Sequence, residues 1–69
     1  MITIYTKPNC QPCRMTKKYL TERHIDFTEI NGLEHIDQLK DEGFASFPVI
    51  KTETDSWAGF NPTKLKTLN

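Results

Sequence analysis

The first residues of the chain alternate apolar and polar side chains, in the segment ITIY at residues 2–5. A period of two, in residues that favour strands, predicts a β-strand there. Residues 11–23 are mostly good helix formers, and Pro12 fits a helix only in its first turn, where its missing N–H removes no hydrogen bond. The pattern therefore predicts a strand followed by a helix that begins at or next to Cys10.

One side of this helix is largely apolar when successive residues are placed about 100° apart. We expect that side to face the core. Cys10 projects toward the polar side, near Arg14 and Lys17, so we expect Cys10 to be accessible and Cys13 to be semi-buried. Apart from Arg23, the apolar side carries Cys13, Met15, Thr16, Tyr19 and Leu20.

Three further strands are predicted over residues 27–30, 49–50 and 56–58, where strand-forming residues cluster. The right-handed crossover of a strand-helix-strand unit would set the second strand parallel to the first. Between the second and third strands, Asn31 is suited to cap a helix that ends at Gly43. The apolar side of that helix carries Leu33, Ile36 and Leu39.

A short last helix is predicted after the fourth strand. Asn61 is suited to cap it, and Pro62 would occupy its first position. Phe60 would pack against Leu65 and fix the start of the helix. The predicted element order is therefore βαβαββα, which is an α/β fold.

The chain has 69 residues, which is enough for a single domain over residues 1–69 with one modest core. Nine basic and nine acidic residues give a formal net charge of zero, so the positive field that draws proteins to nucleic acid is missing. The start of the sequence has no signal-peptide pattern, and no apolar run reaches membrane-spanning length. We therefore expect a cytoplasmic protein without nucleic-acid or membrane partners.

Cys10 and Cys13 form a CxxC motif at the predicted junction of strand and helix. A disulfide across so small a loop stabilises a fold by about 2 kcal/mol at best, so stability is a poor reason for the pair. The N–H groups at the start of the helix favour a thiolate at Cys10, as do the basic side chains nearby. Cys10 would attack a substrate disulfide, and Cys13 would resolve the mixed disulfide. The basic side chains are Lys7, Arg14, Lys17 and Lys18.

Other uses of the two cysteines are a metal site and an inert buried pair. A zinc site would need His24 and His35 as further ligands, but these are eleven residues apart, where zinc-finger histidines stand about three to five apart. We therefore predict no metal ligands. An iron-sulfur cluster would need a dimer or outside thiols. An inert pair would explain neither the close spacing nor the basic surroundings.

Four segments carry a resemblance to a known family: ITIYTKPNC before the CxxC motif, RMTKKYL in the first helix, GFASFPV before the third strand and SWAGF near the end. Together they resemble the NrdH-redoxin family of glutaredoxin-like proteins. The resemblance implies a thioredoxin fold, with a four-stranded mixed sheet of order 2-1-3-4 and three helices. It also implies an electron donor to class Ib ribonucleotide reductase.

In that role, electrons would come from NADPH through thioredoxin reductase. The implied partners are thioredoxin reductase and the large subunit of the ribonucleotide reductase. We expect a monomer with no bound cofactor, whose redox group is the Cys10–Cys13 disulfide. Cys10 would be the attacking thiol and Cys13 the resolving thiol.

The resemblance also assigns residues around the two thiols. Pro48 would be a cis-proline facing them, and the backbone of Phe47 would pair with an extended substrate segment. Lys7 matches a basic position that glutaredoxins share, although it is also consistent with a solvated surface lysine. Trp57, Ala58, Gly59 and Phe60 match a segment near the active site, with core packing as the alternative for the two aromatic residues.

Two positions depart from the patterns of related families. The NrdH-redoxin family commonly has a Gln directly before its second cysteine, whereas Gln11 here is followed by Pro12. A proline directly before the second cysteine resembles thioredoxin itself. Gln11 and Pro12 therefore leave the redox poise open. Conventional glutaredoxins bind glutathione through a Gly-Gly-x-x-Asp segment, but residues 59–63 contain one glycine and no carboxylate. A glutathione-dependent glutaredoxin is thus the alternative that the sequence disfavours.

Overall fold

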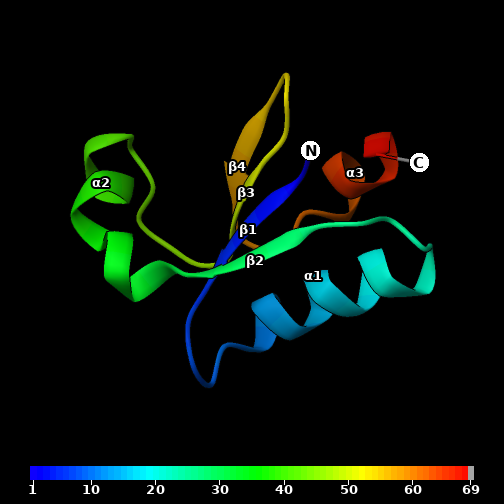
Figure 1. Cartoon of the computed structure of the whole chain (residues 1–69), viewed down its shortest axis with the longest axis horizontal. Helices are drawn as coiled ribbons and strands as arrows, with labels where there is room; N and C mark the ends of the chain where they lie inside the picture. Colours follow the sequence, from blue (N-terminus) through cyan, green and yellow to red (C-terminus); the bar gives the residue numbers. More distant parts are fainter. Residues whose placement is uncertain (69) are drawn as a thin grey trace.

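The computed structural model describes residues 1–68, and its elements follow the predicted order βαβαββα (Figure 1). Most predicted ends lie within one residue of the observed ends. The elements are β1 (Thr3–Thr6), α1 (Gln11–Glu22), β2 (Thr28–Asn31), the 3₁₀ helix η1 (Gly32–His35), α2 (Ile36–Asp41), β3 (Val49–Lys51), β4 (Ser56–Ala58), α3 (Pro62–Leu65) and the 3₁₀ helix η2 (Lys66–Leu68).

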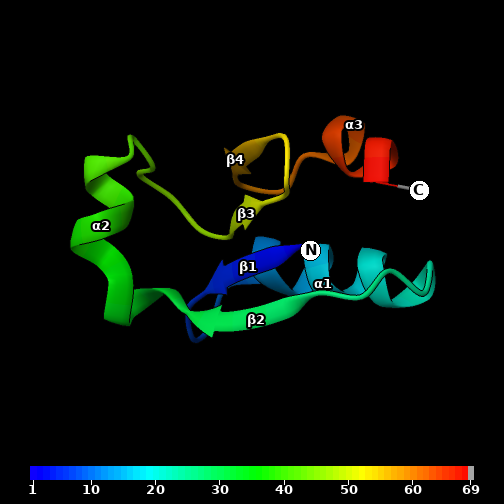
Figure 2. The same ribbon diagram turned by 45° about the horizontal axis from the view of Figure 1, so that its top comes forward.

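The four strands form one mixed sheet of order β2-β1-β3-β4. β1 pairs with β2 in parallel, while β3 runs antiparallel to both β1 and β4. Both the parallel pair and the strand order agree with the expectations from the sequence. The carboxyl ends of β1 and β2 therefore lie at one edge of the sheet, from which the chain enters α1 and η1 (Figure 2).

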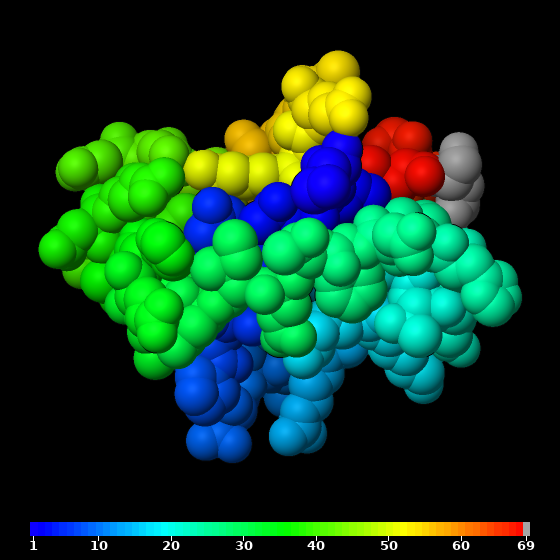
Figure 3. All heavy atoms as spheres, in the orientation of Figure 1, coloured from blue at the N-terminus to red at the C-terminus, as the bar shows by residue number. Residues whose placement is uncertain are grey.

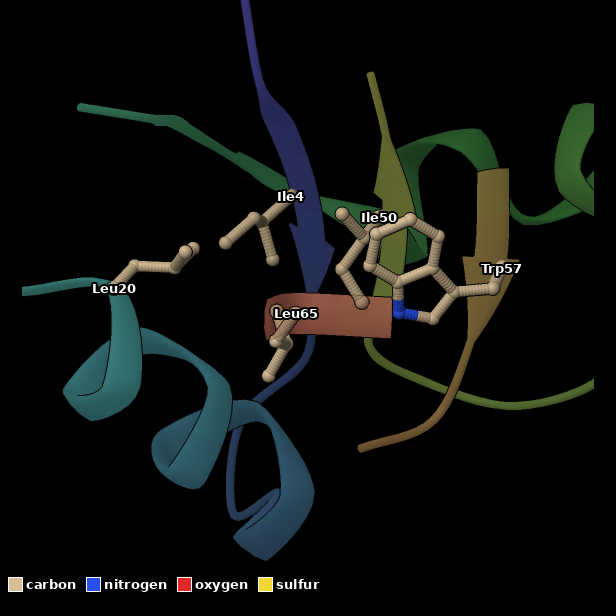
Figure 4. Packing of buried hydrophobic residues seen from close by; sticks show 5 residues of the cluster. All are labelled: Ile4, Leu20, Ile50, Trp57 and Leu65. Carbon is tan, nitrogen blue, oxygen red and sulfur yellow. The ribbon is translucent and has the colours of Figure 1, made fainter. Parts of the chain in front are cut away.

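The main core is a row of side chains across the sheet. Ile4, Ile50 and Trp57 are register partners on β1, β3 and β4, and all three are buried. Leu20 of α1 and Leu65 of α3 cover this row, so these two helices pack on the same face (Figure 4). Burial of each aliphatic side chain contributes about 1.5–3 kcal/mol. The core thereby fixes the position of α1 on the sheet.

The face that α1 turns to the core is narrower than predicted. Cys13, Thr16 and Leu20 are buried, but Met15 is 50% exposed, so its predicted place in the core is wrong. Met15 lies about 100° around the helix from Thr16, on the side away from Cys13. Arg23, the polar residue in the predicted apolar side, places its guanidinium Cζ 3.8 Å from the centroid of the Tyr19 ring.

The second predicted helix is divided into η1 and α2. The Asn31 side chain caps η1 by accepting a hydrogen bond from the Leu33 N–H at 3.1 Å. Of the three apolar residues predicted to face the core, Leu39 is buried, whereas Leu33 is 47% and Ile36 is 37% exposed. The tighter turns of η1 interrupt the 3.6-residue period, so the three side chains do not share one face. Leu33 and Ile36 instead line a surface hollow together with Cys10.

Candidate active site

The two cysteines lie at the start of α1 and form a disulfide. Cys10 is the N-cap residue, and its Sγ accepts a hydrogen bond from the backbone N–H of Cys13 at 3.3 Å. Pro12 occupies the first turn, as its missing N–H requires. A sulfur in this position receives an N–H that the helix leaves without a backbone partner, which favours negative charge on Cys10 when the disulfide is reduced.

Both sulfur-bearing residues are more buried than predicted. Cys10 is 5% exposed and Cys13 is 2% exposed, so the expectation of an accessible Cys10 is wrong for the residue as a whole. Cys10 is nevertheless one of the residues that line two surface hollows, whereas Cys13 lines neither. The inequality between the two cysteines is therefore one of position: a partner that enters either hollow meets Cys10.

The first hollow, which we call the apolar hollow, has a volume of about 460 Å³. It lies between the first turn of α1 and the segment that precedes β3, and it brings together residues that are far apart in the sequence. The half-exposed side chains of Leu33 and Ile36 supply its apolar wall. Its lining includes Lys7, Cys10, Gln11, Pro12, Leu33, Ile36 and Phe47.

Phe47 and Pro48 connect this hollow to the sheet. The Phe47–Pro48 peptide bond is cis, as the resemblance implies, and Pro48 is buried next to β3. The Pro48 carbonyl accepts a hydrogen bond from the Gly59 N–H at 2.8 Å, which ties the segment before β3 to the end of β4. The Lys7 Nζ lies 5.8 Å from the centroid of the Phe47 ring, across the apolar hollow.

The second hollow, which we call the basic hollow, also measures about 460 Å³. Figure 3 shows it below the green β2, between the blue loop of residues 7–9 and the lighter blue side chains of α1. Three of the four basic residues predicted near Cys10 line it: Lys7, Arg14 and Lys17. Lys18, which is exposed, does not line it.

A carboxylate also lines the basic hollow. Glu29 Oε2 accepts hydrogen bonds from the Lys17 Nζ at 2.9 Å and from the Thr6 Oγ1 at 2.8 Å. The Lys17 ammonium and the Thr6 hydroxyl lower the pKa of the Glu29 carboxyl below its usual value, and partial burial opposes this effect. Glu29 is therefore ionised and already paired at neutral pH.

Sequence reasoning missed Thr6, Glu29 and Asn31 as residues of the site. Thr6 and Asn31 are the last residues of the parallel strands β1 and β2, and they are register partners. In parallel sheets, ligands bind at the carboxyl ends of the strands, so the predicted parallel pair could have identified these residues. The signal was present, but it depends on the topology rather than on a motif.

The segment from Trp57 to Phe60 lies in a different place from the two hollows. Trp57 is buried in the main core, and Phe60 packs against the same cluster. Ala58 and Gly59 are half-buried beside them. None of the four lines either hollow, so packing accounts for both aromatic residues, and a partner contact at this segment stays a prediction.

Two further features of the described chain bear on its chemistry. Within residues 1–68, no three His, Cys, Asp or Glu side chains gather closely enough to ligate a metal ion. The helices of the same residues are all too short or too polar to cross a bilayer.

Comparison with known proteins places this site in a family. The family model described as glutaredoxin matches residues 2–56. The glutaredoxin-like protein NrdH of Lactococcus lactis subsp. cremoris is 39% identical over 71 residues, which cover 99% of each chain. NrdH of Escherichia coli is 37% identical, over 99% of this chain and 88% of its own length.

The solved structures give the same result. NrdH-redoxin from Escherichia coli, a glutaredoxin-like protein with a thioredoxin-like activity profile, superposes with a TM-score of 0.93 at 37% identity. The match covers 99% of this chain and 93% of the other. Both proteins thus share the fold that carries the Cys10–Cys13 pair here. The chain therefore belongs to the glutaredoxin family, within which it is a thiol-disulfide oxidoreductase of the NrdH type.

Proposed function

We propose that this protein is the dithiol electron donor of a class Ib ribonucleotide reductase and that thioredoxin reductase recharges it with electrons from NADPH. In each cycle the Cys10 thiolate attacks a target disulfide, forms a mixed disulfide and displaces one target thiol. Cys13, as a thiolate, then attacks the Cys10 sulfur. The second target thiol leaves, and the protein is now oxidised, with a Cys10–Cys13 disulfide. Thioredoxin reductase then reduces this disulfide.

The observation that carries this proposal is the position of Cys10. Its sulfur accepts the Cys13 N–H at the start of α1, and it borders both hollows of the surface. Cys13 lies one turn further along the same helix, where its Cα is 5.2 Å from that of Cys10. An attacking thiol that borders two surface hollows, with a resolving thiol one helical turn away that lines neither, suits the transfer of a disulfide from one protein to another.

The end of β4 supports thioredoxin reductase, rather than glutathione, as the electron source. In this chain, residues 59–63 offer no carboxylate to the amino group of glutathione. The side chain of Asn61 is occupied, because its Oδ1 accepts the Lys64 N–H at 3.2 Å and caps α3. The relative from Escherichia coli has a thioredoxin-like activity profile, which agrees with this choice.

The test supplies one preparation of the protein with two reducing systems. With NADPH and thioredoxin reductase, we expect rapid reduction of a protein disulfide, followed by the fall in NADPH absorbance as NADPH is oxidised. With glutathione, glutathione reductase and NADPH, we expect little turnover. The reverse result would make the protein a conventional glutaredoxin. Cys10→Ser is the control, since it removes the attacking thiol and should be inactive in both systems.

The same proposal includes the target and the setting. Reduced protein should support turnover of a class Ib ribonucleotide reductase in an assay that contains no other dithiol reductant. Cys10→Ser should not support it. We further propose a monomer in the cytoplasm, where thioredoxin reductase and NADPH would be available. Light scattering of the reduced protein tests the monomer. Visible absorbance after anaerobic purification would instead support the iron-sulfur alternative.

A further inference from the structure

The basic hollow carries more positive charge than the chain's own residues neutralise. Lys7, Arg14 and Lys17 line it, together with the single carboxylate of Glu29. Glu29 is paired with Lys17. Within residues 1–68, no carboxylate forms an ion pair with Lys7 or Arg14. The whole chain has a formal net charge of zero, so this excess is local to the hollow.

Cys10 lies where the two hollows meet. It lines both of them, as do Lys7 and Asn9. A target segment whose cysteine reaches Cys10 therefore has the apolar hollow, with Leu33 and Phe47, on one side and the basic hollow on the other. The side chains that flank the target cysteine would lie in these two hollows, so the two surroundings can select the sequence around the target disulfide.

We propose that the basic hollow is a subsite for an acidic side chain, Asp or Glu, that flanks the reacting cysteine of the target protein. Arg14 is the contact residue. It is exposed, it lies one helical turn beyond Cys10, and its guanidinium can bind a carboxylate through two parallel hydrogen bonds. Lys17 contributes less, since it already holds Glu29. The subsite rests on the disulfide exchange of the proposed function, but not on the identity of the reductase or of the target.

The experiment compares two peptide disulfides that differ only by Glu or Gln next to the reacting cysteine. Each is mixed with the reduced protein, and the released peptide thiol is measured by chromatography. For the wild-type protein at low salt, we expect the Glu peptide to react about threefold to fivefold faster, as one solvent-exposed ion pair allows. The ratio should fall toward one as salt is added, because the pair is screened.

Arg14→Gln should reduce this ratio toward one, whereas Lys18→Gln should leave it unchanged. Lys18→Gln is a matched control because it removes the same charge from the same helix, at a residue outside the basic hollow. The same Cys10 thiolate attacks both peptides, so a general change in its reactivity cancels in the ratio. Arg14 is exposed, and circular dichroism of both variants confirms that they are folded.

Two results would overturn the subsite alone, with disulfide exchange still intact. One is an equal rate for the Glu and Gln peptides in the wild-type protein. The other is an equal loss of selectivity in Arg14→Gln and Lys18→Gln, which would indicate a diffuse charge effect. Reduction of neither peptide by the wild-type protein would overturn both the subsite and the proposed function.

Discussion

The ring of Phe47 lies directly against the backbone of Gly32. A Cβ added at Gly32 would stand 2.8 Å from Cζ and 2.9 Å from Cδ1 of that ring, and closer still to Cε1. We expect Gly32→Ala to displace the ring and lower the free energy of unfolding by about 1 kcal/mol. Overpacking costs about 1–3 kcal/mol, and a gain of about 0.4–1 kcal/mol from the stiffer unfolded chain partly offsets it. Urea unfolding measures the change.

A double-mutant cycle with Phe47→Ala shows whether the two residues are coupled. In the Phe47→Ala background the overlap is gone, so Gly32→Ala should be neutral or slightly stabilising. Equal effects of Gly32→Ala in both backgrounds would contradict the contact. The displaced ring would also change the apolar hollow, because Phe47 lines it.

Much of the fold could be predicted from local patterns. β1 was visible because its apolar residues recur with a period of two, and the other three strands because strand-forming residues cluster there. α3 was visible because Asn61 and Pro62 form a recognisable start. The division between η1 and α2 was not visible, because a 3₁₀ turn has no strong sequence signal of its own. Met15 was misplaced because helical periodicity gives the direction of the buried face without its width.

The site was predictable where it depends on residues close in sequence. The two cysteines, the helix start and the basic residues of α1 follow from one short motif. The contact of Phe47 with Gly32 and the pairing of Glu29 with Thr6 were not predictable, since each joins segments that only the tertiary fold brings together. Burial of Cys10 was also missed, because it depends on the residues of both hollows around it.

The positions of the two thiols predict unequal trapping of partners. Cys13→Ser leaves the attacking thiol but removes the resolving thiol, so mixed disulfides through Cys10 should accumulate. Cys10→Ser should trap few, because Cys13 lines neither hollow and is 2% exposed. Non-reducing gels with an oxidised protein substrate count the mixed disulfides. Equal trapping by the two variants would contradict the assignment of Cys10 as the attacking thiol and Cys13 as the resolving thiol.

The narrow buried face of α1 predicts different costs for two apolar residues. Leu20→Ala should lower the free energy of unfolding by about 2–5 kcal/mol, since the side chain is fully buried in the main core. Met15→Ala should change it by no more than about 0.5 kcal/mol, because half of that residue is exposed. Chemical unfolding, followed by the fluorescence of the single Trp57, compares them. Similar losses of unfolding free energy for the two variants would mean that Met15 is packed in the core.

The Glu29 carboxylate predicts how stability changes with pH. Lys17 and Thr6 lower its pKa in the folded protein below that of the unfolded chain, which is about 4.3. The stabilisation is therefore fully present above the unfolded pKa and is lost as pH falls through the folded pKa. Because the Glu29 side chain is 42% exposed, it amounts to no more than about 1 kcal/mol.

Glu29→Gln isolates this contribution from those of other carboxylates. The wild-type protein should be more stable than the variant at pH 6, and the difference should shrink toward zero as the pH falls below about 4, where the unfolded carboxyl and then the folded one take up a proton. Lys17→Gln should reproduce part of the loss, since Lys17 is the largest cause of the lowered pKa, and adding it to Glu29→Gln should cost little more. Parallel stability curves for wild type and Glu29→Gln across this range would mean that the Lys17–Glu29 pair does not stabilise the fold.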